Sequence, residues 1–223
     1  MTIMQSSIIE SSIIEPSTVQ PHSLQPCSLQ SALPRCHWCT ADALYQVYHD
    51  TEWGKPSHDR QYLFEMLCLE GQQAGLSWIT VLKKRERYRQ QFFNFDPAAI
   101  ASLTPADLAE RVQDSGLIRH AGKLSAIVDN SKAWLTLEQN GTTMVEWLWS
   151  FVPEASQPLQ IGYDQSAVMR AASVAHEASV AMAKALKKSG FRFVGATTCY
   201  AFMQAVGMVN DHDPSCFCYS ANP

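Results

Sequence analysis

From residue 35 onward, apolar residues recur at intervals of three and four, the spacing of a helix that buries one face. Asp59 stands where its side chain can cap such a helix, whose apolar positions include Leu63 and Leu67. We expect Gly71 and Gly75 to interrupt this helix. The same spacing predicts further helices over about 77–85, 104–115, 123 to beyond 134, 144–151, 166–188 and 197–209. Alternating β-branched residues are scarce and 191–194 is the only run that favours a strand, so the predicted class is all-α.

The first 34 residues differ from the rest in composition. They contain no Lys or Arg, their only acids are Glu10 and Glu15, and sixteen of them are Ser, Gln or Pro. Such a segment buries too little apolar surface to offset the entropy lost on ordering. It also lacks the basic and apolar regions of a targeting signal. We therefore predict a disordered low-complexity extension over 1–34 and one domain over 35–223.

Charge and cysteine content narrow the function classes. The 223 residues carry a formal net charge of -4, which excludes binding of polyanions by bulk charge alone but leaves room for a local basic face. No apolar run approaches the ~18 residues needed to span a membrane. Seven cysteines, an odd number unevenly spread, argue against a secreted disulfide framework and for a reducing compartment, by default the cytoplasm.

Two separated groups of Cys and His residues have the chemistry of a metal site. Cys36 and Cys39 form a C-x-x-C near the start of the domain, and His212 and Cys216 form an H-x-x-x-C near its end. Together they suggest a zinc ion that ties the first ordered segment to the last, with His49 as a further candidate ligand. The alternative is that the cysteines are small buried hydrophobes. Because no catalytic zinc signature accompanies these residues, a structural ion is preferred.

The segment from Tyr45 to Trp78 combines aromatic residues with a carboxylate at the end of an apolar helix face, Glu70. Aromatic side chains beside a desolvated carboxylate can stack a planar ring and accept hydrogen bonds from its edge, and a cationic ring is favoured further. The alternative is a helix end with core aromatics and an exposed Glu. The short tip Gly75-Leu76 is either a plain turn or a wedge into a base stack.

A tight turn at 117–126 separates two predicted helices. Backbone N–H groups at the start of the second helix, with Arg119 and Lys123 alongside, would suit one DNA phosphate, and the basic residues of 83–89 could extend this face. A glycine turn followed by Lys is common, however, and charge runs usually only solvate a helix.

Four ordered motifs in residues 35–223 together resemble the 3-methyladenine DNA glycosylase I family of the helix-hairpin-helix superfamily. They are Arg35-Cys36-x-Trp38, Tyr45-x-x-Tyr48-His49-Asp50-x-Glu52-Trp53-Gly54, Leu69-Glu70-Gly71-x-Gln73-Ala74-Gly75-Leu76-Ser77-Trp78 and Val209-Asn210-Asp211-His212. The resemblance implies a DNA-repair enzyme that flips 3-methyladenine out of double-stranded alkylated DNA, hydrolyses its N-glycosidic bond and leaves an abasic site, without a strand-cleaving lyase step. We further expect a monomer with a structural zinc and no organic cofactor.

The resemblance also assigns individual residues. It makes Glu70 the base-recognising and catalytic carboxylate. The other residues that it implies are the base-binding Trp38, Tyr45, Tyr48 and Trp78, the DNA-binding Gly75, Leu76, Arg119, Gly122 and Lys123, and the zinc ligands Cys36, His49, His212 and Cys216.

The hairpin, placed at 115–123, departs from the superfamily pattern because His120 stands where the first Gly is usual, and the superfamily's catalytic Asp has no counterpart. N3-methylation explains that absence, because it makes adenine a cationic leaving group that needs little proton transfer. Two other classes remain open: a protein that binds damaged DNA without excision, and a hydrolase with a catalytic zinc.

Overall fold

A computed structural model describes residues 33–152, 159–160 and 165–219, and all of these except Leu33 fall within one compact unit, Pro34–Pro223. The predicted disordered extension, apart from Leu33 and Pro34, lies outside the described residues, so the proposed division of the chain stays a prediction. In chain order the helices are α1 (Ala43–Thr51), α2 (Arg60–Gln73), α3 (Trp78–Leu82), α4 (Arg85–Gln91), the 3-10 turn η2 (Phe93–Phe95), α5 (Pro97–Ala101), α6 (Pro105–Gln113), α7 (Ala121–Gln139), α8 (Met144–Trp149), α9 (Gln165–Lys188) and α10 (Ala196–Ala205). None of the described helices is long and apolar enough to cross a membrane.

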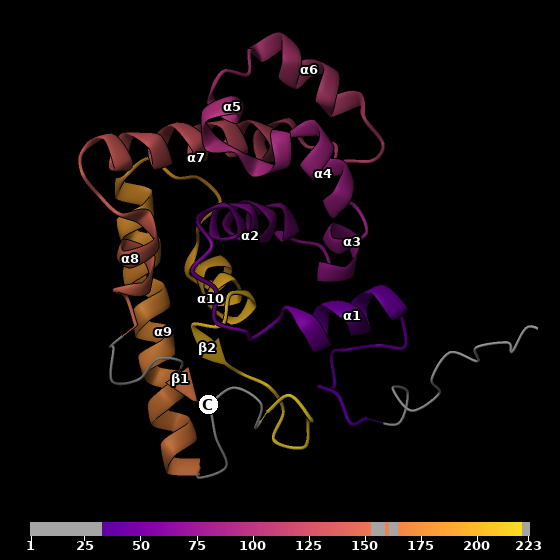
Figure 1. The fold of residues 1–223 in the computed structure, drawn as a ribbon, viewed down its shortest axis with the longest axis vertical. Coiled ribbons are helices and arrows are strands. Elements are labelled where there is room, and N and C mark those ends of the chain that lie inside the picture. Colours follow the sequence, from indigo (N-terminus) through magenta and orange to yellow (C-terminus); the bar gives the residue numbers. More distant parts are fainter. Residues whose placement is uncertain (1–32, 153–158, 161–164, 220–223) are drawn as a thin grey trace, which may run out of the picture. The chain divides into compact units, whose positions relative to one another are not determined.

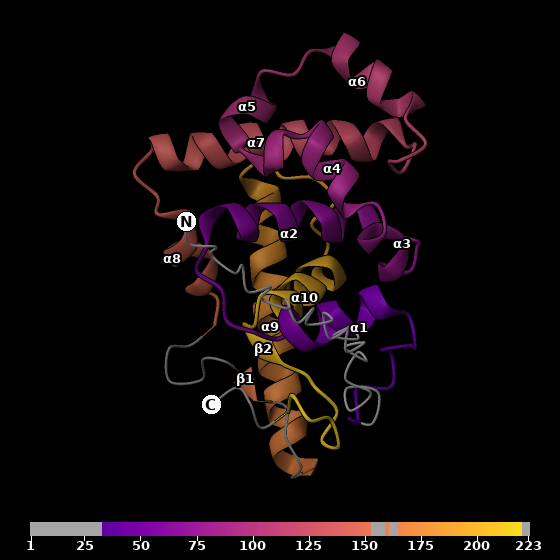
Figure 2. The same ribbon diagram turned by 45° about the vertical axis from the view of Figure 1, so that its right-hand side comes forward.

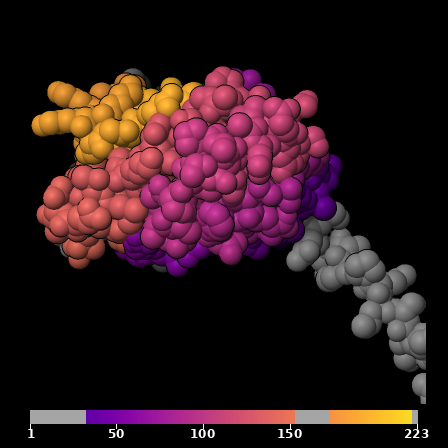
Figure 3. Space-filling view, turned by 90° about the horizontal axis from the view of Figure 1, so that it is seen from above, coloured from indigo at the N-terminus to yellow at the C-terminus, as the bar shows by residue number. Residues whose placement is uncertain are grey.

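The fold is mostly helical, as predicted, and α2 lies at its centre (Figures 1 and 2). α7 runs above α2, α10 lies below it, and α9 packs along α10. The strands β1 (Leu159–Gln160) and β2 (Val209–Asn210) form a parallel ladder with Leu159 opposite Val209. Seen from above, the segment from α4 to α7 forms most of the visible face (Figure 3).

The N-terminal caps that the sequence indicates are present. The Asp59 carboxylate accepts a hydrogen bond from the Tyr62 N–H at the start of α2. Thr104 and Asp107 form a complete capping box at the start of α6. Because these caps satisfy orphan N–H groups with neighbouring side chains, they are encoded locally and the sequence predicts them correctly.

Helix α2 passes through Gly71, so the predicted interruption there is wrong. A Cβ atom at Gly71 would lie 3.2 Å from the Cβ of Phe193, so the glycine provides a close approach between α2 and the α9–α10 loop. The chain turns only after Gln73, where Gly75 adopts a φ of +78°. Gly71 is therefore needed for close packing, and Gly75 for the geometry of the turn.

Two further boundaries differ from the prediction. The single helix expected over 77–85 is divided at Lys83–Lys84 into α3 and α4. The last helix ends at Ala205, not near 209, because Gly207 has a φ of +74° and its missing Cβ makes room for the backbone of Lys55. The run 191–194 is not a strand.

Candidate functional site

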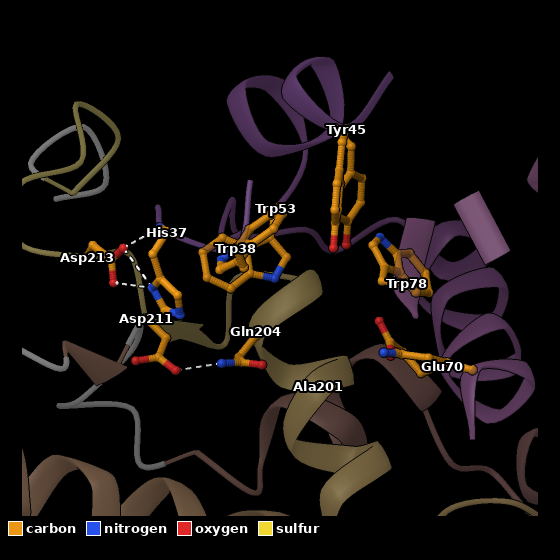
Figure 4. A pocket seen from close by; sticks show the side chains of 12 residues that line it. His37, Trp38, Tyr45, Trp53, Glu70, Trp78, Ala201, Gln204, Asp211 and Asp213 are labelled. Carbon is orange, nitrogen blue, oxygen red and sulfur yellow. Dashed lines mark hydrogen bonds and ion pairs between the residues drawn. The ribbon is translucent and has the colours of Figure 1, made fainter. Parts of the chain in front are cut away.

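A cavity of about 340 Å³ lies between the N-terminal loop, α1, the end of α2, the start of α3, α10 and the loop after β2. Its volume is in the range of small-molecule sites. The lining residues are His37, Trp38, Tyr45, Tyr48, Trp53, Glu70, Gln73, Trp78, Ala201, Gln204, Asp211 and Asp213. The structure thus brings together Glu70 and the four aromatic residues expected to bind a base (Figure 4).

Aromatic rings form most of the apolar wall of the cavity. The ring centroids of Tyr48 and Trp78 lie 5.4 Å apart, and Trp38 lies 5.0 Å from Tyr45 and 4.8 Å from Trp53. Figure 4 shows Trp78 and Glu70 across the cavity from Trp38 and Trp53. Planar faces that enclose a cavity in this way are suited to stacking on a planar ring.

Two polar atoms in this wall, Oε2 of Glu70 and Nε1 of Trp78, are buried and have no hydrogen-bond partner in the described part of the chain. Glu70 is only 5% exposed, and burial raises the pKa of its carboxyl from 4.5 to about 8. Desolvation alone causes this rise, because no neighbouring charge contributes. Since unpaired buried polar groups are costly, an acceptor and a donor left unpaired in the wall of a cavity indicate a site that a ligand completes.

Sequence reasoning missed the polar side of the cavity. Asp211 lies there, and its Oδ2 accepts hydrogen bonds from the Tyr200 hydroxyl at 3.2 Å and from the Gln204 amide. Burial raises the pKa of Asp211. Asp211 belongs to a motif that carries the family resemblance, but nothing local indicated that α10 would bring Gln204 to it.

Cys36, His49, His212 and Cys216 form one buried cluster whose ligand atoms all lie within 4.8 Å of one another. The S–N separations are 3.3 Å for Cys36–His212, 3.4 Å for Cys216–His49 and 3.6 Å for Cys216–His212. A tetrahedral zinc, with sulfur at about 2.3 Å and nitrogen at about 2.0 Å, separates neighbouring S and N ligands by about 3.5 Å. The four residues therefore fit zinc.

The surroundings of the cluster also suit a metal. The second nitrogen of His49 lies 2.8 Å from Asp50, and that of His212 lies 3.3 Å from the carbonyl of Trp53. Cys36 Sγ accepts a hydrogen bond from a backbone N–H at 3.2 Å, and Cys216 Sγ accepts another at 3.4 Å. Such contacts orient imidazole ligands and stabilise thiolates. Cys39 and Cys218 lie outside the four-residue cluster.

The predicted hairpin occupies the turn between α6 and α7. His120 caps α7, because its Nδ1 accepts the Lys123 N–H at 3.1 Å. Arg119 is exposed and, in the described part of the chain, has no hydrogen-bond or ion-pair partner. Lys123 differs from the expectation: its ammonium is buried and donates to carbonyls at the end of α2, not toward solvent.

The basic run 83–89 does not form the free positive face that the sequence suggested. Four of its five basic side chains are matched by acids from other segments: Lys83 pairs with Asp42, Arg85 with Glu52 and Glu65, Arg87 with Asp114, and Arg89 with Glu65. The fifth, Lys84, donates to the Ser115 carbonyl at 2.6 Å. The probing tip does lie at the surface, with Leu76 41% exposed beside the cavity wall.

A helical domain whose aromatic-walled cavity contains a buried carboxyl has a site suited to a planar ring such as an extruded nucleobase. The profile of the methyladenine glycosylase family matches residues 38–219. The chain therefore belongs to the methyladenine glycosylase family. This confirms the family resemblance and the enzyme class, a glycosylase.

Relatives and solved structures agree with this membership. DNA-3-methyladenine glycosylase 1 of Escherichia coli K12 is 52% identical over 190 residues, which cover 85% of this chain and 99% of that protein. The DNA-3-methyladenine glycosylase of Haemophilus influenzae is 52% identical over 184 residues, covering 82% and 97% of the two chains. A Staphylococcus aureus 3-methyladenine DNA glycosylase I structure superposes with a TM-score of 0.74 at 34% identity, covering 86% and 98%.

One further solved structure includes a bound base. It is that of a 3-methyladenine DNA glycosylase I variant in complex with 3-methyladenine, 32% identical to this chain, with a TM-score of 0.68 and coverage of 81% and 96%.

Proposed function

We propose that this chain hydrolyses the N-glycosidic bond of 3-methyladenine in double-stranded alkylated DNA, releases the free base and leaves an abasic site as the first step of base-excision repair. The observation that carries the proposal is the unpartnered Glu70 carboxyl inside an aromatic cavity. Relatives 52% identical that are named DNA-3-methyladenine glycosylases support the same substrate.

The proposed recognition step depends on charge. The extruded nucleotide enters the cavity, its base stacks on the aromatic rings, and the Glu70 carboxyl accepts hydrogen bonds from the base edge. N3-methylation gives the nucleobase a positive charge, and that charge stabilises the ionised form of Glu70, which burial alone disfavours. Neutral adenine supplies no such compensation, so the desolvated carboxyl selects the alkylated base.

The proposed chemistry is hydrolysis only. The cationic base is a good leaving group, so water attacks the sugar carbon with little need for proton transfer to the base. No lysine is among the described residues that line the cavity, which supports the absence of a Schiff-base step. Leu76, at the exposed tip after Gly75, is proposed to enter the base stack as the nucleotide is extruded, and Arg119 and the Gly122 N–H to hold a phosphate.

We further propose that Cys36, His49, His212 and Cys216 hold a structural zinc. When bound, the ion would cross-link the start and end of the domain, because the four ligands come from both regions and complete its coordination. The cluster also adjoins the cavity: Trp53 lies between the two, 4.6 Å from the His212 ring. Loss of the cross-link is therefore expected to disturb both stability and the base pocket.

We also propose that the protein is a monomer and is located in the cytoplasm. The six cysteines in the described part of the chain are free thiols, which suits a reducing compartment.

The test is chromatography of bases released from methylated double-stranded DNA, scoring 3-methyladenine against 7-methylguanine. We expect release of 3-methyladenine and no strand cleavage before alkali treatment. Glu70→Gln should lower the release rate, whereas Glu110→Gln, at an exposed site on α6, should not. Binding to methylated DNA with full retention of its bases would favour the binding-only alternative and overturn the proposal.

A further inference from the structure

The end of α2 and the start of α7 are joined by a reciprocal set of hydrogen bonds. The Lys123 ammonium donates to the carbonyls of Gln72 and Ala74, each at 2.7 Å, and the Gln72 amide donates back to the Lys123 carbonyl at 2.9 Å. Both residues are buried, with Lys123 6% and Gln72 1% exposed. We call this set, Lys123 with Gln72 and Ala74, the clamp; its Lys123–Gln72 part is shielded from solvent, whereas Ala74 lies at an exposed position.

A second pair of hydrogen bonds connects Gln72, through Tyr88, to the residues before α7. The Gln72 Oε1 accepts the Tyr88 hydroxyl at 3.1 Å, and the Tyr88 oxygen accepts the Ile118 N–H at 3.2 Å. Ile118 lies within the turn that leads into α7, and Lys123 lies in the first turn of α7. One side chain of α2 thus connects to both ends of the predicted phosphate-binding turn, and it lies two residues from Glu70.

The clamp binds the C-terminal end of α2. The last carbonyls of a helix have no partner within it, and they form the negative end of its dipole, which a cation stabilises. Lys123 supplies that cation to the turn that carries Glu70 and leads into Gly75-Leu76. The raised pKa of Glu70 follows from burial.

The alternative use of Lys123, a direct DNA phosphate contact, conflicts with this geometry. Two carbonyls already accept from its ammonium, and exposing it would break both bonds in a buried site. Arg119, exposed and without a partner in the described part of the chain, is the cation at this turn that is free to meet a phosphate.

We propose that Lys123 is a positioning residue that locks the end of α2 to the hairpin, so that the base pocket and the DNA-anchoring turn keep a fixed spacing. This inference rests on the proposed function. With the lock in place, a phosphate held at the hairpin defines where the extruded base meets Glu70. A displacement of about 1 Å in such a geometry costs up to about 100-fold in rate.

The test compares Lys123→Met with Lys132→Met, which removes an exposed lysine from the same helix. Gln72→Met removes the other half of the clamp and is the second variant should Lys123→Met not fold. We expect Lys123→Met and Gln72→Met to lower the single-turnover rate of 3-methyladenine release by about 10- to 100-fold at 25 °C, and Lys132→Met to match the wild type. Wild-type rates for both clamp variants would overturn the proposal.

Two readouts separate this inference from the proposed function and from a general loss of stability. The salt dependence of DNA binding should keep its slope in Lys123→Met but fall by about one in Arg119→Ala. Amide hydrogen exchange should rise at the last turn of α2 and at Gly75-Leu76 and remain at wild-type levels in α9. A reduced slope in Lys123→Met, or unchanged exchange at the end of α2, refutes the clamp. If the wild type releases no 3-methyladenine, the proposed function fails while these readouts still decide the clamp.

Discussion

Replacing Glu70 with Gln tests the electrostatic basis of the pocket through the stability of the free protein. The pKa of Glu70 rises from 4.5 to about 8 because its carboxyl is desolvated. Between these values the folded protein holds a proton that the unfolded chain has released, so stability falls as pH rises from 4.5 to 8. At 1.36 kcal/mol for each tenfold change in proton affinity, the full loss is about 5 kcal/mol, of which about 4 kcal/mol accumulates between pH 4.5 and pH 8. The neutral amide of the Glu70→Gln variant does not titrate in this range, so the variant escapes that loss.

The assay is urea denaturation of the wild type and Glu70→Gln at pH 4.5 and pH 8. We expect similar free energies of unfolding for the two proteins at pH 4.5. At pH 8 the variant should be several kcal/mol more stable, with about 5 kcal/mol as the upper bound. Glu110→Gln, on the surface of α6, should follow the wild type at both pH values. A difference between Glu70→Gln and the wild type that does not change with pH would show that the cavity solvates Glu70, and the selection of a cationic base by desolvation would be refuted.

Three other predictions concern the metal, the backbone and the pocket wall. Elemental analysis should find one zinc per chain, and Cys36→Ser should remove it and lower the urea midpoint; a metal-free wild type of full stability would exclude the structural ion. Gly207→Ala should cost more than about 4 kcal/mol, because its Cβ would overlap the carbonyl carbon of Lys55, whereas Gly141→Ala, with a similar positive φ but open space, should cost only about 1–2 kcal/mol by urea denaturation. Trp78→Phe keeps a ring but loses the unpartnered N–H, and should weaken binding of free 3-methyladenine about tenfold by titration calorimetry; unchanged affinity would mean that this N–H does not meet the base.

Much of the site was predictable because its chemistry lies in residue type and spacing. Residue type and spacing singled out Cys36, Cys39, His212 and Cys216, with His49 as a further candidate, and the family resemblance reduced this set to the four residues that the fold brings together. Glu70 stood out as a carboxylate at the end of an apolar helix face. The polar side of the cavity was not predictable, because Asp211 is held there by hydrogen bonds from Gln204 and Tyr200, which belong to a different element, α10.

The sequence by itself determined the helical class, the caps at Asp59 and Thr104, and the residues able to bind a metal or stack a base. The class and the caps follow from periodicity and from contacts between chain neighbours, whereas the metal and base-stacking candidates follow from residue type and from the family motifs. Only the tertiary structure decided which charges remain free. Four of the five basic side chains in 83–89 pair with acids distant in sequence, and the Lys123 ammonium turns inward to α2. The reason is physical: a charge acts on what lies near it in space, and its partners come from segments that only folding brings together.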